Sequence, residues 1–153
     1  NNMVLPSSYS FGAGIGNDLK WFVGAEYTAT KTSKFNASYN YDNGSYTDYS
    51  KIGIGGFITP KYNSLTTYFA RMTYRAGFNY ENTELAINNE EIKGYNANVG
   101  LGLPVGSWNS NINIGFEYGQ RGNTNMGLIK ENYYGFNIGF SFNDIWFKRR
   151  KFD

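Results

Sequence analysis

The chain has 153 residues, of which 19% are aromatic and 17% are charged, and its formal net charge is +2. It contains no histidine and no cysteine, which excludes disulfides, thiolate or imidazole metal ligands and Ser-His-Asp triads within these residues. The basic excess is small and the basic residues are scattered except at the extreme C-terminus, so we expect no nucleic-acid partner. We also expect no enzymatic activity, no catalytic residue, no metal site and no cofactor.

The dominant pattern is alternation with a period of two, which recurs in seven runs and predicts β-strands. One face of each run is aromatic and aliphatic, and the other is mostly Gly, Asn and Ser with a few charges. The runs are about 9–13 residues long, which suits tilted strands that cross a bilayer better than soluble strands of about 5–6 residues. In chain order they are Ser8–Gly16, Lys20–Thr28, Tyr49–Ile58, Tyr68–Tyr80, Gly94–Leu103, Asn111–Gly119 and Asn132–Phe142.

The connections between the runs alternate in length. Short ones follow the first, third and fifth runs, and the long polar ones are 31–48, 81–93 and 120–131. Outer-membrane barrels place short turns in the periplasm and long loops outside the cell. The alternation therefore predicts an outer-membrane location with the C-terminus in the periplasm.

Rings with a polar tip lie near the strand ends, among them Trp21, Tyr27, Tyr80, Tyr118 and Tyr134, and they share a face with Ile and Val. Barrels carry such aromatic girdles at both membrane interfaces. A soluble sandwich or barrel is the alternative, but its outward face would be rich in Lys, Glu and Thr rather than Gly and Asn. The pattern favours an all-β fold, an antiparallel transmembrane β-barrel over residues 1–153, with outer-membrane lipid and lipopolysaccharide as partners.

Seven strands is an odd number, whereas single-chain bacterial barrels have even counts. Open edges in lipid would leave backbone groups unpaired at a cost of several kcal/mol each. We therefore expect further strands upstream, so that these residues are the C-terminal portion of a larger barrel. A short eighth strand at Phe35–Tyr41 is the alternative.

The candidate site residues are charged side chains on the polar face of the runs. One interpretation is a charged lumen that sets the field along a transport path. The favoured one is that opposite charges pair across the barrel and fill it. Inward glycines likewise indicate strand curvature rather than a wider lumen. The lumen-facing charges are Glu26, Lys51, Arg71, Arg75 and Glu117.

Two charged segments lie outside the runs. The acidic connection with Glu81, Glu84, Glu90 and Glu91 is either a solvated loop, which we favour, or a divalent-cation site beside lipopolysaccharide. A periplasmic tail at 144–153 ends the chain. Its basic residues are either solvated, which we favour, or in contact with anionic headgroups or a periplasmic partner. They are Lys148, Arg149, Arg150 and Lys151.

Several segments resemble one family. They are Leu5-Pro6-Ser7, Leu101–Pro104, Asn111–Thr124, Leu128–Tyr133, Gly139–Asp144 and Trp146–Asp153. Together they resemble the C-terminal half of FadL-like outer-membrane transporters of hydrophobic compounds, whose barrel has about fourteen strands. The resemblance implies passive uptake of hydrophobic small molecules such as long-chain fatty acids as cargo. The family's N-terminal plug has no counterpart here, so no substrate-contacting residue is assigned.

A second function is a structural or scaffold barrel in an outer-membrane assembly or secretion complex, with envelope proteins as partners. Separately from that alternative, the final run, Asn132–Phe142, ends in aromatic residues and looks like the signal that barrel-assembly machinery reads in barrels, although residues 144–153 extend past it. An outer-membrane hydrolase is the third alternative, and the missing histidine counts against it.

Overall fold

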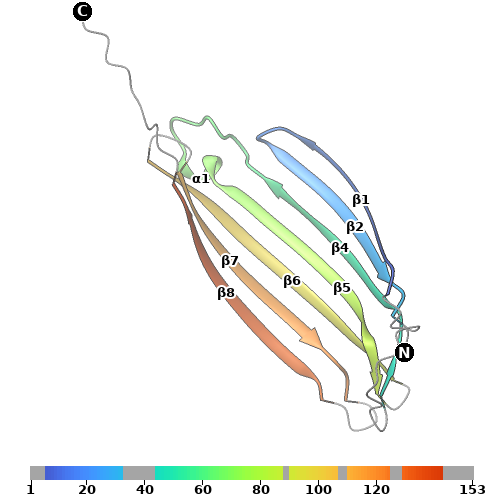
Figure 1. The fold of residues 1–153 in the computed structure, drawn as a ribbon. Coiled ribbons are helices and arrows are strands. Elements are labelled where there is room, and N and C mark those ends of the chain that lie inside the picture. The colour runs from blue at the N-terminus through green and yellow to red at the C-terminus, as the bar shows by residue number, and fades with distance from the viewer. Residues whose placement is uncertain (1–5, 33–43, 88–89, 107–109, 125–128, 143–153) are drawn as a thin grey trace, which may run out of the picture.

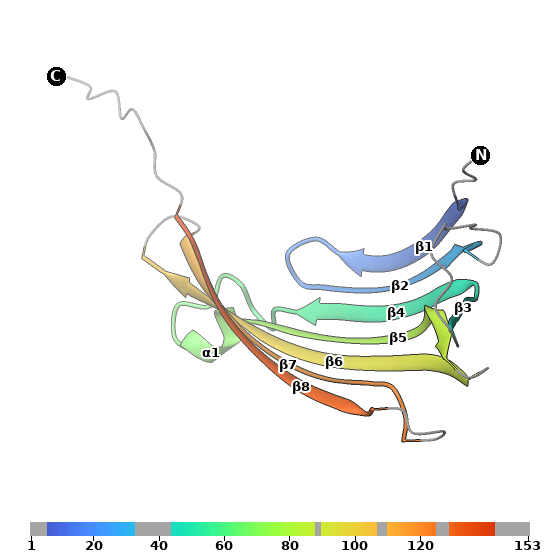
Figure 2. The same ribbon diagram turned by 60° about the horizontal axis from the view of Figure 1, so that its bottom comes forward.

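The computed structural model describes residues 6–32, 44–87, 90–106, 110–124 and 129–142. They form one antiparallel sheet, a single layer that curves into a trough (Figures 1 and 2). A four-residue helix lies at one end. The elements are β1 (Ser8–Asn17), β2 (Trp21–Thr30), β3 (Gly44–Tyr46), β4 (Tyr49–Ile58), α1 (Tyr68–Arg71), β5 (Thr73–Ile87), β6 (Glu90–Val105), β7 (Ser110–Arg121) and β8 (Glu131–Ser141).

The strands pair in the order β1-β2-β4-β5-β6-β7-β8, and β3 pairs with the far part of β5. Each long strand therefore lies beside the next long strand of the chain, as the alternation predicts. This confirms the all-β antiparallel class. The sheet is open, however, and the described residues do not close into a barrel of 14 strands.

The pairing register sorts the two faces. Ile54 lies opposite Ala25 and Phe78, and Phe78 lies opposite Ala97, so apolar side chains gather on one face. The other face is the inner side of the curved sheet. A hollow on it is lined by residues of strands from β1 to β6, from Gly12 to Asn98. We call the Gly- and Asn-rich side the concave face and the aromatic and aliphatic side the convex face.

The convex face is uncovered. In the described part of the chain, the buried hydrophobic residues are Met72 and Ala86 alone. Phe11 and Ile15 are each 71% exposed, and Phe136 is 68% exposed. Burial of apolar surface is the main force that stabilises folded proteins. A single layer with this face open to water lacks that stabilisation, so the face requires a cover.

Aromatic rings mark the ends of the apolar band on the convex face. Tyr80 lies opposite Tyr95, and the rings of Tyr118 and Tyr134 are 5.1 Å apart. One pair further along, the same face becomes polar, with Asn82 opposite Lys93. At its other end, the apolar band finishes with a row formed by Trp21, Ile58 and Tyr74. We call the end of the sheet with Trp21 the short-turn end, and the end with Tyr80 and Tyr95 the long-loop end.

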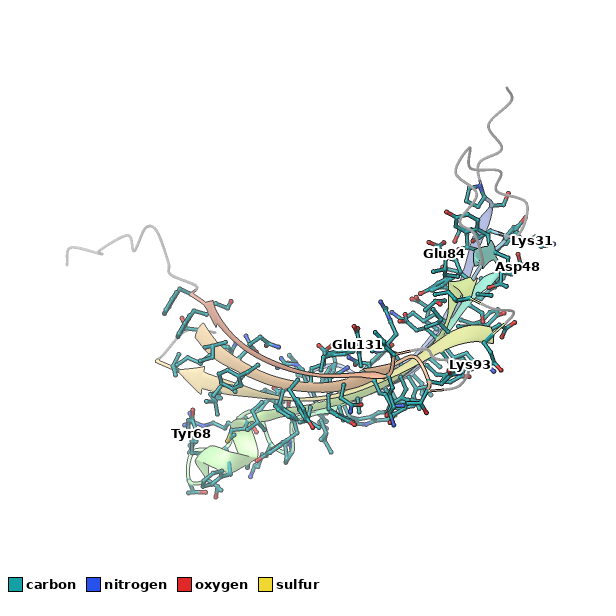
Figure 3. All side chains as sticks on the ribbon, turned by 90° about the horizontal axis from the view of Figure 1, so that it is seen from below. Lys31, Asp48, Tyr68, Glu84, Lys93 and Glu131 are labelled. Atoms are coloured by element: carbon teal, nitrogen blue, oxygen red, sulfur yellow. The ribbon has the colours of Figure 1, made fainter. Side chains whose placement is uncertain are left out.

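The fourth run was predicted as a strand from Tyr68 to Tyr80, and this is wrong at its start. Tyr68–Arg71 forms α1, and β5 begins at Thr73. Two contacts accompany this departure from the alternation. The Ser64 hydroxyl accepts a hydrogen bond from the nearby Thr67 amide at 3.2 Å, and the Tyr68 hydroxyl donates to the carbonyl of Pro104, which is distant in sequence, at 3.1 Å. Figure 3 shows Tyr68 on the convex side of the sheet.

Two predicted loops contain strand. β5 and β6 run through most of 81–93, with an irregularity between Asn82 and Ala86. The connection 31–48 contains β3, which brings the strand count to eight. Both additions extend the sheet at the long-loop end, where the Thr47 amide donates to the Glu84 carbonyl at 2.9 Å. Figure 3 labels Lys31, Asp48 and Glu84 at this end. The alternative strand at Phe35–Tyr41 lies outside the described residues.

Candidate functional site

The concave face carries a row of polar side chains across β4, β5, β6 and β7. Lys51 lies opposite Glu81, Glu81 opposite Gly94, and Gly94 opposite Arg121. Residues opposite each other in a sheet point to the same face, so the register alone gathers these charges. They line a polar hollow of about 300 Å³ together with asparagines and Tyr133.

Glu81 and Arg121 form the ion pair of this row. The Arg121 Nη2 atom donates to Glu81 Oε1 at 2.6 Å, and the two side chains meet across Gly94 of the strand between them. The hydrogen bond from Arg121 to Glu81 raises the pKa of Arg121, so the guanidinium remains charged. Because the Arg121 side chain is 56% exposed, the pair contributes at most about 1 kcal/mol to stability.

Arg75 reaches across a neighbouring strand in the same way. Its Nη1 atom donates to Asn113 Oδ1 at 3.0 Å, from β5 over β6 to β7. The guanidinium passes over Gly102, where a Cβ atom would lie 3.0 Å from Nη1. Glycine at this position therefore gives the arginine its path along the sheet.

Glu117 accepts a hydrogen bond from a side-chain amide rather than pairing with an opposite charge. The Asn96 amide donates to Glu117 Oε1 and also to the Tyr133 hydroxyl, the latter at 3.2 Å. These three side chains come from β6, β7 and β8, so they connect the last three strands near the long-loop end. The arrangement satisfies a carboxylate without requiring a cation.

The N-terminal part of the concave face is held by hydroxyls. Thr28 Oγ1 donates to Glu26 Oε1 at 3.3 Å and lies 2.8 Å from the Ser10 hydroxyl. Lys51 lies in the adjacent strand opposite Thr28. Tyr49 begins β4 beyond the aromatic band; burial raises its pKa, and the Glu81 carboxylate acts in the same direction.

The predicted site residues thus lie in two places. Glu26, Lys51, Arg75 and Glu117 lie on the concave face, on four different strands. Arg71 does not join them: it lies in α1, with its guanidinium carbon 5.3 Å from the centre of the Tyr68 ring. The prediction for Arg71 was wrong because the helix begins where the strand was expected. Lys148, Arg149, Arg150 and Lys151 lie outside the described residues.

The sequence missed the charged pair that the register forms. Glu81 and Arg121 were assigned to loops, although both continue the alternation of their strands. Charge on the concave face is nearly balanced, since Glu26, Glu81, Glu117 and Glu131 face Lys51, Arg75 and Arg121. Such a surface suits polar contacts with water or protein better than the attraction of one ion type.

The family model described as BamG matches residues 1–153. No curated protein and no solved structure matches the chain. Within the described residues, no helix is long and apolar enough to span a membrane.

The match overturns the resemblance drawn from sequence. BamG is a family of the BAM complex in the outer membrane and is distinct from the FadL-like transporters. The FadL assignment and the passive uptake of hydrophobic cargo that it implied are therefore wrong. The same match confirms the outer-membrane location and places the chain among proteins with envelope protein partners.

Proposed function

The chain belongs to the BamG family, and on that premise we propose that it is a non-enzymatic, structural subunit of the outer-membrane BAM complex. The observation that carries this proposal is the family match over all 153 residues. It favours the scaffold function, the alternative drawn from the sequence, over the transporter that the FadL-like resemblance implied.

We further propose that the sheet crosses the outer membrane as part of a larger barrel. Three features support this placement: strands β1, β2 and β4 of 10 residues each, an uncovered apolar convex face, and aromatic rings at both ends of the band. Strands of about 9–11 residues cross a bilayer when tilted. The convex face would meet hydrocarbon, and the concave face would line the interior.

In this placement the short-turn end and the basic tail at 144–153 face the periplasm. The long-loop end, where β3, β5 and β6 extend beyond the aromatic rings, faces the cell exterior. Both ends project polar side chains outside the membrane, so both are surfaces on which other subunits of the complex can dock.

Affinity purification in detergent tests the subunit proposal. The full-length protein carries a tag at one terminus, and an unrelated outer-membrane barrel with the same tag is the control. We expect other BAM components, identified by mass spectrometry, to co-purify in stoichiometric amounts with the tagged protein and not with the control. Purification of the folded protein alone, without any BAM component, would contradict the proposal.

A further inference from the structure

The convex face contains an apolar hollow of about 680 Å³ over β2, β4 and β5. Its floor is the row in which Gly56 lies opposite Val23 and Ala76. Larger side chains bound it on both sides; the row towards the short-turn end is Trp21, Ile58 and Tyr74. The size falls in the range of small-ligand sites, about 300–1,000 Å³, and the lining atoms are almost all apolar.

A cation stands at the short-turn end of each of the three strands that form the hollow. Lys20 directly precedes Trp21, Lys61 follows Ile58 by three positions, and Arg71 precedes Tyr74 by three. Backbone hydrogen bonds bring these segments together: the Thr59 amide donates to the Lys20 carbonyl at 2.6 Å, and the Lys61 amide donates to the Ala70 carbonyl at 2.7 Å. All three side chains are exposed.

The short-turn end is cationic. Contacts also hold α1, in the segment that connects β4 and β5, in place. The described connecting residues at this end are 18–20, 59–72 and 106. Among them, Asp18 is the one acid beside the three cations. The Tyr74 hydroxyl donates to the Phe69 carbonyl at 3.1 Å, so α1 is bonded to a residue that lines the hollow. Arg71 lies over the Tyr68 ring, so its charge is held on the convex side.

We propose that this hollow binds an acyl chain of an anionic phospholipid, with Lys20, Lys61 and Arg71 around the phosphate. An apolar hollow that ends in a cluster of cations is complementary to an amphiphile with a negative headgroup. Arg and Lys form strong charge-assisted hydrogen bonds to phosphate oxygens. The inference rests on the proposed placement of the convex face in lipid, and it adds a specific lipid site to that face.

Trp21 is a reporter inside the hollow. The full-length protein is reconstituted into vesicles that mix phosphatidylglycerol and phosphatidylcholine, with bromine on the acyl chains of one lipid at a time. Bromine quenches a nearby indole, and subtraction of the Trp21→Phe signal isolates this residue. Three cations at about fivefold each would give a preference of up to about a hundredfold for the brominated phosphatidylglycerol, and we expect at least about tenfold, since these side chains are exposed.

Two sets of variants assign the preference to the site. Replacing Lys20, Lys61 and Arg71 together with Gln is expected to reduce the preference to within about twofold, since each nearby cation contributes about fivefold. Lys130→Gln, at the opposite end, is the matched control and should leave it unchanged. Ala76→Phe fills the floor and should abolish the preference, whereas Ala97→Phe, on the same face outside the hollow, should not.

The possible failures are distinguishable. Equal quenching by both lipids would remove the specific site and leave the membrane placement intact. No quenching by either lipid would overturn both the site and that placement. Quenching that is lost only when BAM components are bound would show that a protein covers the hollow, and this would also overturn the lipid site.

Discussion

Val99→Arg is expected to prevent stable folding of the protein in a bilayer. Val99 lies near the middle of β6 on the convex face, opposite Ala76 and Phe116, and is 57% exposed. An arginine on the lipid face of a barrel costs about 2–4 kcal/mol at the bilayer midplane. We expect the folded fraction, measured by the heat-dependent shift in gel mobility after refolding into vesicles, to fall strongly.

Asn98→Arg is the matched control, because it adds the same charge one residue away on the concave face. Asn98 lines the concave hollow, so an arginine there projects into the interior and should refold almost as well as the wild type. If the convex face met water instead, Val99→Arg would be an ordinary surface change within about 0.5 kcal/mol. Equal refolding of the two variants would therefore contradict a lipid-covered convex face.

Gly56→Ala is expected to destabilise the sheet strongly, although it adds only one methyl group. A Cβ atom at this position would overlap the backbone carbonyl oxygen of Phe22 and lie 3.2 Å from Val23 Cα. Because these atoms belong to the neighbouring strand, relief requires β2 and β4 to separate. Overpacking of this kind costs about 1–3 kcal/mol, and the midpoint of urea unfolding in vesicles measures it.

Gly100→Ala is the control for the effect of adding a methyl group to a strand glycine. Its Cβ atom would lie 3.5 Å from the nearest atom, the Ile114 carbonyl oxygen, which is ordinary van der Waals contact. Gly to Ala changes without strain stabilise a protein by about 0.4–1 kcal/mol through the unfolded state. A Gly56→Ala midpoint equal to or above that of Gly100→Ala would show that the strands do not pack as closely as described.

The strands and the two faces could be predicted because alternation is a local property of the sequence. Tyr49–Ile58 was predicted with the bounds that β4 has, and its three isoleucines share the convex face with Tyr80 and Phe78. The helix at Tyr68–Arg71 could not be predicted, because the alternation continues through it. One of the contacts that hold it is the hydrogen bond from Tyr68 to Pro104, which is distant in sequence.

The polar site was predictable only in part. Glu26, Lys51, Arg75 and Glu117 follow from the period of two, but their partners depend on the register between strands. Glu81 meets Arg121 because β5 extends past the expected end of the strand and because Gly94 separates them. The family was misassigned for a different reason: the segments that resemble FadL-like transporters consist mostly of alternating strand residues with aromatic ends. Such residues are required of any membrane strand, so they do not distinguish one barrel family from another.

Accessibility along β6 tests the central claim that lipid covers the convex face. The chain contains no cysteine, so single cysteines at positions 96 to 101 can each carry a spin label in the reconstituted full-length protein. We expect oxygen, which concentrates in lipid, to reach labels at Ala97, Val99 and Leu101, and a water-soluble nickel complex to reach those at Asn96, Asn98 and Gly100. Nickel access to both sets of labels, without alternation, would contradict the account.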